Sequence, residues 1–261
     1  MSRLLREKII NVEKAAENIY RMTVASEYVS SNAVPGQFVN IKCCEGTQAL
    51  LRRPVSICSV DREKGEFDIL FQVKGSGTEI LAGKKSGDSL DILGPLGRGF
   101  DLNIAYRRIA VVGGGIGIFP LLFLLDESKA IVKRSYLGFR SSENILLLDE
   151  FRKRSSSIET ATEDGSCGIK GFVTDILERD ILSGEFDMIY ACGPNPMLKT
   201  VSAIAGKYRV RCQISMEQRM GCGFGACLAC ACKATTDGGG WQYVRVCRDG
   251  PVFDSEDVIF E

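Results

Sequence analysis

The sequence predicts an α+β protein made of three consecutive parts: an antiparallel β-barrel, a parallel α/β domain and a small cysteine-rich module. Three observations support this prediction. Short β-like runs fill residues 1–102, strand and helix patterns alternate over 103–216, and cysteines gather in 217–261. A chain of 261 residues is long enough for two or three such units. We therefore take these three ranges as the predicted domains.

The N-terminal part alternates apolar runs with turn-forming residues. The runs "QFVNIKC", "PVSICSV" and "FDILFQV" have the composition of strands, and "PG", "DREKG" and "KSGD" separate the strand-like segments. Short strands with turns between them at regular spacing are typical of antiparallel sandwiches and barrels. We expect an antiparallel barrel over residues 1–102.

The pattern changes near residue 105. "RIAVV" has the composition of a buried strand, and a glycine-rich loop and the apolar stretch "FPLLFLLDES" follow it. "AIVKRSYLGF", "GFVTDILERD", "DMIYACG" and "PMLKTVSAIAG" continue the alternation of strand and helix patterns. Such alternation predicts a parallel sheet covered by helices.

Charge and hydropathy exclude several classes of protein. Lysine plus arginine and aspartate plus glutamate both total 33, so the formal charge is zero, whereas nucleic-acid-binding domains usually carry a basic excess. The charged start "MSRLLREKII" lacks the apolar core of a signal peptide, and no apolar run reaches the roughly 18 residues of a membrane helix. We expect a cytoplasmic chain with no nucleic-acid or membrane partner, in which thiols stay reduced.

Histidine is absent from the whole sequence. This removes the commonest general base, the Ser-His and Cys-His nucleophile pairs, and the histidine-containing zinc and Rieske sites. If the chain is an enzyme, a cofactor must carry its chemistry.

Four cysteines have the spacing of an iron–sulfur site. Cys222, Cys227 and Cys230 form C-x4-C-x2-C, and Cys247 follows after sixteen intervening residues. The first spacing is that of plant-type [2Fe–2S] ferredoxins, in which a fourth thiolate comes from farther along the chain. The interleaved glycines allow the loop to wrap around a cluster with its N–H groups toward the sulfurs. A Cys₄ zinc site and unligated thiols are the alternatives, and Cys232 is a substitute ligand that we expect not to be used.

Two glycine-containing turns predict a dinucleotide site. "VVGGGIGIFP" follows a strand and opens a helix, and "YACGPNPM" has the same organisation, with Asn195 as an expected helix cap. Both turns lie at strand C-terminal ends, where parallel α/β sheets bind ligands. A tight strand–helix turn without a ligand would also explain either motif alone. The candidate binding residues are Gly114, Gly115, Gly117, Cys192 and Gly193.

These motifs together resemble a known family. "RRPVS" and "KGSGT" in the barrel, then "GGGIGIFP", "CGPNPM" and "MGCGFGACLAC", are similar to the ferredoxin–NADP⁺ reductase superfamily. Their order, and "RDGPVF" after the last cysteine, resemble the electron-transfer subunits of class 1B dihydroorotate dehydrogenases. The resemblance covers nearly the whole chain. It implies FAD in the barrel, NAD⁺ in the α/β domain and a [2Fe–2S] cluster bound by Cys222, Cys227, Cys230 and Cys247.

The resemblance also assigns the flavin site. Arg53 would meet the FAD pyrophosphate, Pro54 and Val55 would hold extended backbone beside the ring, and Ser56 would bond near the N5 edge. The aromatic residue of the superfamily's Arg-x-Tyr/Phe-Ser/Thr motif is replaced by Val55, which fits the pyrimidine-pathway subunits. Taken alone, "RRPVS" would be an exposed arginine pair and "KGSGT" a turn. The remaining implied flavin contacts are Leu70, Phe71, Gln72, Gly77 and Thr78.

The implied activity is an electron relay in pyrimidine biosynthesis. An FMN-containing dihydroorotate dehydrogenase subunit would be the partner, in a heterotetramer with two of each chain. Nicotinamide accepts electrons only in pairs, the cluster carries them singly, and flavin does both. The small subunit of an NADH-dependent ferredoxin:NADP⁺ oxidoreductase is the alternative enzyme. A redox-sensing or zinc-stabilised binding module is the non-enzymatic one. Arg140, after "LGF", leaves the choice between NAD and NADP open.

Overall fold

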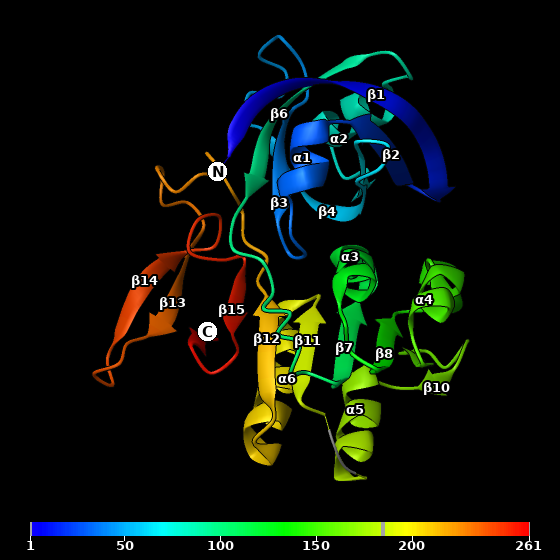
Figure 1. The fold of residues 1–261 in the computed structure, drawn as a ribbon, viewed down its shortest axis with the longest axis vertical. Helices are drawn as coiled ribbons and strands as arrows, with labels where there is room; N and C mark the ends of the chain where they lie inside the picture. Colours follow the sequence, from blue (N-terminus) through cyan, green and yellow to red (C-terminus); the bar gives the residue numbers. More distant parts are fainter. Residues whose placement is uncertain (1, 184–185, 261) are drawn as a thin grey trace.

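The computed structural model describes residues 2–183 and 186–260, which form a barrel, a central sheet and a C-terminal module (Figure 1). Within these residues, all neighbouring barrel strands are antiparallel and close in the order β1-β2-β5-β4-β3-β6. This confirms the predicted antiparallel barrel. Its elements are β1 (Arg3–Ala16), β2 (Ile19–Ala25), α1 (Glu27–Asn32), β3 (Phe38–Lys42), β4 (Arg53–Asp61), β5 (Glu66–Gln72), α2 (Ser76–Ala82) and β6 (Ser89–Leu96).

The strand β3 illustrates why these segments form a barrel. Successive side chains of a strand point to opposite faces. Val39 and Ile41 belong to the core inside the barrel, whereas Phe38 belongs to the core that the central sheet shares with the C-terminal module. The outer face of β3, with Phe38 and Asn40, is therefore turned toward the rest of the molecule.

The central sheet has the predicted parallel strands. In the part of the chain that the structure describes, it has seven strands in the order β10-β9-β8-β7-β11-β12-β15, and only β15 runs antiparallel to its neighbour. Its elements are β7 (Arg108–Gly114), η1 (Gly115–Ile118), α3 (Phe119–Glu127), β8 (Val132–Phe139), η2 (Ser142–Asn144), α4 (Leu148–Arg154), β9 (Ser157–Thr162), β10 (Ile169–Lys170), α5 (Val173–Leu182), β11 (Met188–Cys192), α6 (Asn195–Tyr208) and β12 (Arg211–Ser215).

The helices cover both faces of this sheet. Ile109 and Val111 of β7 share a core with α3 and α4, while Ala110 and Val112 share one with α5 and α6. A strand buried on both faces reads as a continuous apolar run, which explains "RIAVV".

Helix α3 joins the sheet to the barrel. Every residue from Phe119 to Leu125 is buried, as expected for a helix that is apolar all round. Phe123 belongs to the barrel core, whereas Leu121, Leu122 and Leu124 belong to the core of the sheet. This helix thus fixes the barrel against the sheet (Figure 1).

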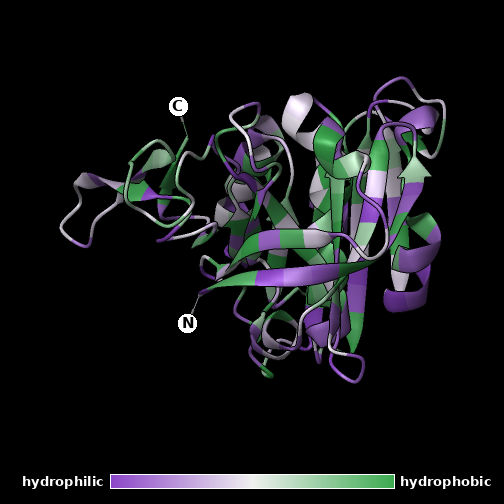
Figure 2. Ribbon diagram, turned by 90° about the horizontal axis from the view of Figure 1, so that it is seen from above, coloured by the Kyte–Doolittle hydropathy of each residue, from purple (hydrophilic) through white to green (hydrophobic). Residues whose placement is uncertain are grey.

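The C-terminal segment takes part in two sheets. β13 (Ala231–Thr235), β14 (Trp241–Arg245) and β16 (Val258–Ile259) form a small antiparallel sheet in the order β14-β13-β16, set to one side of the molecule (Figure 2). β15 (Val252–Asp254) pairs with β12 instead, so part of the range 217–261 lies in the central sheet. Among the described residues, no helix combines the length and apolar composition needed to cross a membrane.

Candidate functional site

The two barrel motifs, "RRPVS" and "KGSGT", lie next to each other in the fold. Strand β4 begins at Arg53, and Pro54 and Ser56 pair with Asn40 and Phe38 of β3. Gly77 lies in the first turn of α2, where a Cβ atom would come 2.7 Å from Nε of Arg53. "RRPVS" and "KGSGT" therefore meet, and the missing side chain of Gly77 leaves room for the guanidinium group.

The turn before α2 is tied by Thr78. Its Oγ1 accepts hydrogen bonds from the backbone N–H groups of Lys74 (2.9 Å) and Gly75 (3.2 Å) and donates to the carbonyl oxygen of Gly75 (2.9 Å). In this conformation the Thr78 hydroxyl closes the turn.

The two glycine turns also meet, at the carboxyl ends of the neighbouring strands β7 and β11. A Cβ atom at Gly117 would lie 2.6 Å from the carbonyl oxygen of Cys192, and one at Gly193 would lie 2.9 Å from the backbone nitrogen of Gly114. Gly115 has a φ of +54° and open space around it. Close packing thus accounts for these glycines, against the neighbouring turn at Gly117 and Gly193 and against the Met197 and Pro194 side chains at Gly114. Asn195 was expected to cap α6 but is its first helical residue, because the chain enters the helix at Pro194 without a side-chain cap.

One cavity of about 270 Å³ unites these motifs. Its wall includes strand β4, the end of β5, the glycine turn after β7 and the turn after β11. Among the proposed cofactor-binding residues, Gly77, Gly114 and Gly115 do not line it. Those that do are Arg53, Pro54, Val55, Ser56, Leu70, Phe71, Gln72, Thr78, Gly117, Cys192 and Gly193.

Several lining residues escaped the sequence analysis. Five of them come from two segments that approach the cavity only in the folded chain: the outer face of β3, and the linker between β12 and the cysteine loop. The apolar composition of β3 gives no sign of this role, but the linker's position just before the cysteines was a usable signal. These additional residues are Phe38, Lys74, Ile116, Phe119, Pro120, Ser215, Met216, Glu217, Gln218, Met220 and Pro251.

The cavity suits a planar aromatic group with an anionic tail. Apolar side chains and extended backbone form much of its wall, and Arg53 and Lys74 supply positive charge at the barrel end. Burial raises the pKa of the Cys192 thiol to about 12, so this group is a neutral thiol at physiological pH. The wall also carries the carboxylate of Glu217, and apolar walls with placed polar groups are typical of cofactor sites.

The cysteine loop directs backbone N–H groups at sulfur, as predicted. Sγ of Cys222 accepts hydrogen bonds from the backbone N–H groups of Phe224 (3.5 Å), Ala226 (3.2 Å) and Cys227 (3.5 Å). Burial alone would raise the pKa of Cys222, but these donors outweigh it and lower the pKa to about 6. Gly223 and Gly225 take φ values of +78° and +91°, which this tight loop requires.

The four cysteines of the motif lie in two pairs. The Cys222 backbone N–H donates to Sγ of Cys227 (3.3 Å), and the Cys247 N–H donates to Sγ of Cys230 (3.4 Å). The second pair is buried, whereas Cys227 is exposed. Across residues 2–183 and 186–260, no three His, Cys, Asp or Glu side chains are arranged to hold a single metal ion.

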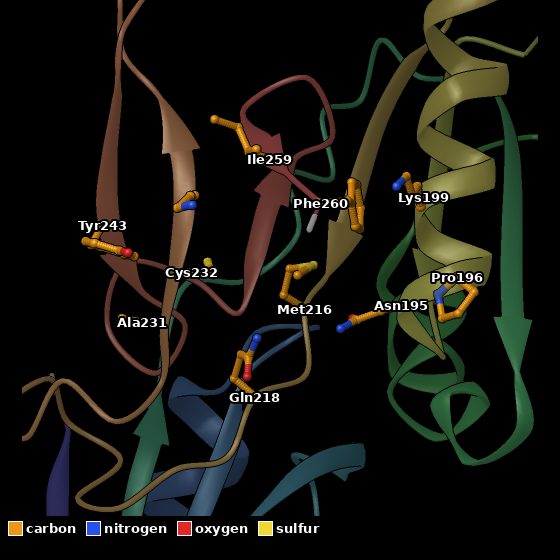
Figure 3. A pocket seen from close by; sticks show the side chains of 11 residues that line it. Asn195, Pro196, Lys199, Met216, Gln218, Ala231, Cys232, Tyr243, Ile259 and Phe260 are labelled. Atoms are coloured by element: carbon orange, nitrogen blue, oxygen red, sulfur yellow. The ribbon is translucent and has the colours of Figure 1, made fainter.

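Cys232 borders a second cavity of about 520 Å³. This cavity lies between the first turns of α6, with Asn195 and Lys199, and the small C-terminal sheet, with Cys232 and Tyr243 (Figure 3). Burial raises the pKa of Cys232 to about 11. Cys232 therefore differs in surroundings from Cys222, whose sulfur receives several backbone donors.

The fold and site define a class: flavin- and nicotinamide-dependent oxidoreductases with an iron–sulfur module. Family models bear this out in each part of the chain. Residues 7–100 match the oxidoreductase FAD-binding domain, residues 111–203 the oxidoreductase NAD-binding domain, and residues 217–259 the iron-sulfur cluster binding domain of dihydroorotate dehydrogenase B.

Comparison with individual proteins narrows the class. The chain is 42% identical to the dihydroorotate dehydrogenase B (NAD(+)) electron transfer subunit of Bacillus mycoides, and 43% identical to that of Bacillus cereus. Each match spans 256 residues and 96% of both chains. The chain belongs to the family of dihydroorotate dehydrogenase B electron transfer subunits.

Solved structures agree with this fold. An NADH-dependent reduced ferredoxin-NADP oxidoreductase chain is 32% identical, with a TM-score of 0.84 over 97% of this chain and 89% of that one. A ferredoxin NADP⁺ reductase from Neisseria gonorrhoeae, 16% identical, has a TM-score of 0.65 over 78% of this chain and 91% of its own. The second likeness concerns the fold alone.

Proposed function

We propose that this chain passes electrons from a dihydroorotate-oxidising partner subunit to NAD⁺, with a [2Fe–2S] cluster and FAD as the carriers. The observation that carries this proposal is the shared cavity, whose wall comes from the barrel, both glycine turns and the linker into the cysteine loop. In such a cavity the proposed flavin and nicotinamide motifs share one wall, and the linker in that wall leads to the proposed cluster loop. The relatives from Bacillus mycoides and Bacillus cereus are dihydroorotate dehydrogenase B (NAD(+)) electron transfer subunits, which supports the same proposal.

The chain's own residues fit these groups. Arg53, beside the first turn of α2, supplies a forked cation for a pyrophosphate, and Pro54 to Ser56 supply extended backbone beside a flat ring. Gly117 and Gly193 allow the two turns to pack closely together at the opposite wall, which is the proposed place of the nicotinamide next to that ring. When bound, flavin exchanges electrons in pairs with nicotinamide and singly with an iron–sulfur cluster.

Cys222, Cys227, Cys230 and Cys247 are the proposed cluster ligands. Two pairs of thiols suit a cluster with two irons, each iron bound by one pair. N–H groups aimed at Cys222 stabilise its thiolate form, which is the form that binds iron. The remaining cysteine of the loop region, Cys232, is proposed to remain a free thiol.

A catalytic subunit with its own FMN is the proposed partner, in an assembly with two copies of each chain. The side chains of Phe224 and Leu228 support a docking surface at the cysteine loop, since they are 54% and 61% exposed. Exposed apolar residues beside a redox centre are suited to contact with an electron-donating partner. The dihydroorotate site would lie on that partner.

A second function has a specific observation in its favour. The NADH-dependent reduced ferredoxin-NADP oxidoreductase chain matches almost the full length of this one with the same fold. This chain would then be the small subunit of an enzyme that exchanges electrons between NADH and a partner flavin subunit. The two candidates share every site described above and differ in the partner.

One experiment separates the candidates. The chain is purified with its native partner, and flavin, iron and sulfide are quantified in the complex. Under the proposal, the isolated chain reduces a dye with NADH but does not oxidise dihydroorotate, and an FMN-containing partner couples dihydroorotate oxidation to NAD⁺ reduction. A partner that reduces NADP⁺ with ferredoxin, and leaves dihydroorotate untouched, would establish the second function instead.

A further inference from the structure

A buried asparagine connects the barrel to the cysteine loop. Asn40 lies on the outer face of β3, and its side chain is fully buried. Its Nδ2 donates a hydrogen bond of 2.8 Å to the backbone carbonyl oxygen of Cys222. This bond joins residues 182 positions apart in the sequence.

The loop is shaped to receive this amide. A Cβ atom at Gly223 would lie 2.3 Å from Nδ2 of Asn40, which is closer than real Cβ atoms approach their neighbours. Gly223 also has a φ of +78°, a conformation that other residues adopt rarely. Glycine at 223 thus allows the loop to settle directly onto Asn40.

The barrel holds Asn40 rigidly from its own side. Asn40 pairs with Pro54 of β4 and with Leu93 of β6. Nη1 of Arg52 donates to the Asn40 carbonyl oxygen (3.2 Å), and Nη2 of Arg52 pairs with Oδ1 of Asp91 (2.7 Å). Phe38 of the same strand and Pro54, the pairing partner of Asn40, line the proposed flavin cavity, whereas Asn40 itself lies next to this wall and does not line it.

Folding stability alone does not account for an amide at this position. Within the described part of the chain, Oδ1 of Asn40 is buried and has no hydrogen-bond partner. A buried acceptor without a donor is unfavourable, so an apolar side chain of similar shape would suit the barrel better. The bond that the side chain makes, to Cys222, is the contact that an apolar residue would lose.

We propose that Asn40 is a positioning residue that fastens the cluster loop to the wall of the flavin cavity. It holds the proposed ligand Cys222, and the N–H groups around its sulfur, in a fixed place relative to that cavity. This inference rests on the proposed function, because it gives the loop a role in passing electrons between cluster and flavin. Asn40 acts through the loop and contacts neither reacting group itself.

The test compares Asn40→Leu with a matched control, Gln37→Leu. Gln37 is also an amide of the barrel with two hydrogen bonds, to Gly97 and from Val34, but its bonds stay within the barrel. In Asn40→Leu, backbone amides of residues 222–227 should exchange hydrogen about five- to tenfold faster, the effect of losing one hydrogen bond. In the control, exchange at this loop should stay at the parent value.

A second readout is the reduction potential of the cluster, followed by its electron paramagnetic resonance signal. N–H groups that bond to cluster sulfur favour the reduced, more negative form. Loosening the loop in Asn40→Leu should therefore shift the potential to a more negative value and broaden the signal.

The rate at which NADH reduces a dye should be unchanged in Asn40→Leu, because neither NADH nor the dye is proposed to contact Asn40.

Asn40→Ser, whose hydroxyl is too short to reach Cys222, should reproduce both changes. Should neither Asn40 variant fold, Gly223→Ala tests the contact from the loop side with the same readouts. If any folded variant kept both the hydrogen-exchange rates and the cluster potential of the unsubstituted protein, the proposed role of Asn40 would be overturned. If the unsubstituted protein contained no iron, the proposed function would be overturned instead. The hydrogen-exchange rates of residues 222–227 would still decide whether Asn40 holds the loop.

Discussion

The cysteine loop shows how single residues prepare a site before any metal arrives. Three backbone N–H groups surround Sγ of Cys222 and lower the pKa of its thiol to about 6. Arg245 supports the loop from outside, since its Nη1 donates to the Gly225 carbonyl oxygen (3.2 Å) and its guanidinium pairs with Asp249. The loop thus owes its shape to backbone donors and to one arginine of β14.

Serine substitutions test the proposed ligands individually. We expect Cys222→Ser, Cys227→Ser, Cys230→Ser and Cys247→Ser each to lose iron, because a cluster with two irons needs four thiolates. Cys232→Ser should keep the parent iron content and serves as the control. Iron and acid-labile sulfide per chain are the measurement. Full iron in Cys247→Ser, or loss only in Cys232→Ser, would contradict the assignment.

Substitution of Arg53 tests the proposed flavin site. A charge-assisted bond to a pyrophosphate contributes about 1.5–3 kcal/mol, so Arg53→Ala should bind FAD about ten- to a hundredfold more weakly. Arg62→Ala is a matched control, because Arg62 pairs with Glu127 and does not line the cavity. Titration of flavin-free protein with FAD gives both affinities. Equal FAD affinities in the two variants would show that Arg53 does not bind the pyrophosphate.

At the scale of elements, helix α3 links the two large parts. The sequence "FPLLFLL" is apolar on every side because the helix packs on the sheet with some residues and on the barrel with Phe123. Polar contacts reinforce the same junction: Arg21 of β2 pairs with Glu150 of α4, and Arg62, directly after β4, pairs with Glu127 of α3. Barrel and sheet should therefore unfold together.

Phe123→Ala tests this coupling. Removal of a fully buried phenylalanine side chain should lower the free energy of unfolding by about 3–5 kcal/mol. Leu4→Ala, at a side chain that is 66% exposed, should change it little. Urea unfolding followed by far-ultraviolet circular dichroism and flavin fluorescence is the measurement. Separate transitions for barrel and sheet in the parent protein would show that α3 does not couple them.

At the scale of the whole molecule, the three parts converge on one cavity. The barrel supplies β4, the sheet supplies two glycine turns, and the linker before the cysteines supplies Glu217, Gln218 and Met220. Pro251, between the last cysteine and β15, returns to the same wall. In the proposed relay, electrons enter at the cluster, pass to the flavin at the barrel and leave to the nicotinamide at the sheet.

Cluster-free variants test that order. A correctly folded Cys222→Ser protein should keep its NADH-to-dye activity, because hydride exchange with flavin does not need the cluster. The same protein, mixed with the dihydroorotate-oxidising partner, should lose coupled reduction of NAD⁺. Steady-state rates of both reactions, beside Cys232→Ser as the control, are the measurement. A full coupled rate without iron would mean that electrons bypass the cluster.

The sequence by itself determined the features that depend on neighbouring residues. Alternating apolar runs predicted the barrel, strand–helix alternation predicted the parallel sheet, and the spacing of Cys222, Cys227 and Cys230 predicted the cluster loop. These signals are readable because strand periodicity, glycine turns and ligand spacing are set within a few residues. The candidate residues of the cavity wall followed from motifs of the same local kind.

Only the tertiary structure decided which distant segments meet. Phe38 lines the cavity, β15 pairs with β12 in the central sheet, and Asn40 donates a hydrogen bond to the Cys222 carbonyl oxygen. The prediction that Asn195 caps α6 was wrong, because Pro194 is the N-cap residue and Asn195 is already the first residue of the helix. Each outcome depends on how the barrel, the sheet and the C-terminal segment pack against one another. Such packing depends on shape and burial across the whole chain, so no short stretch of sequence encodes it.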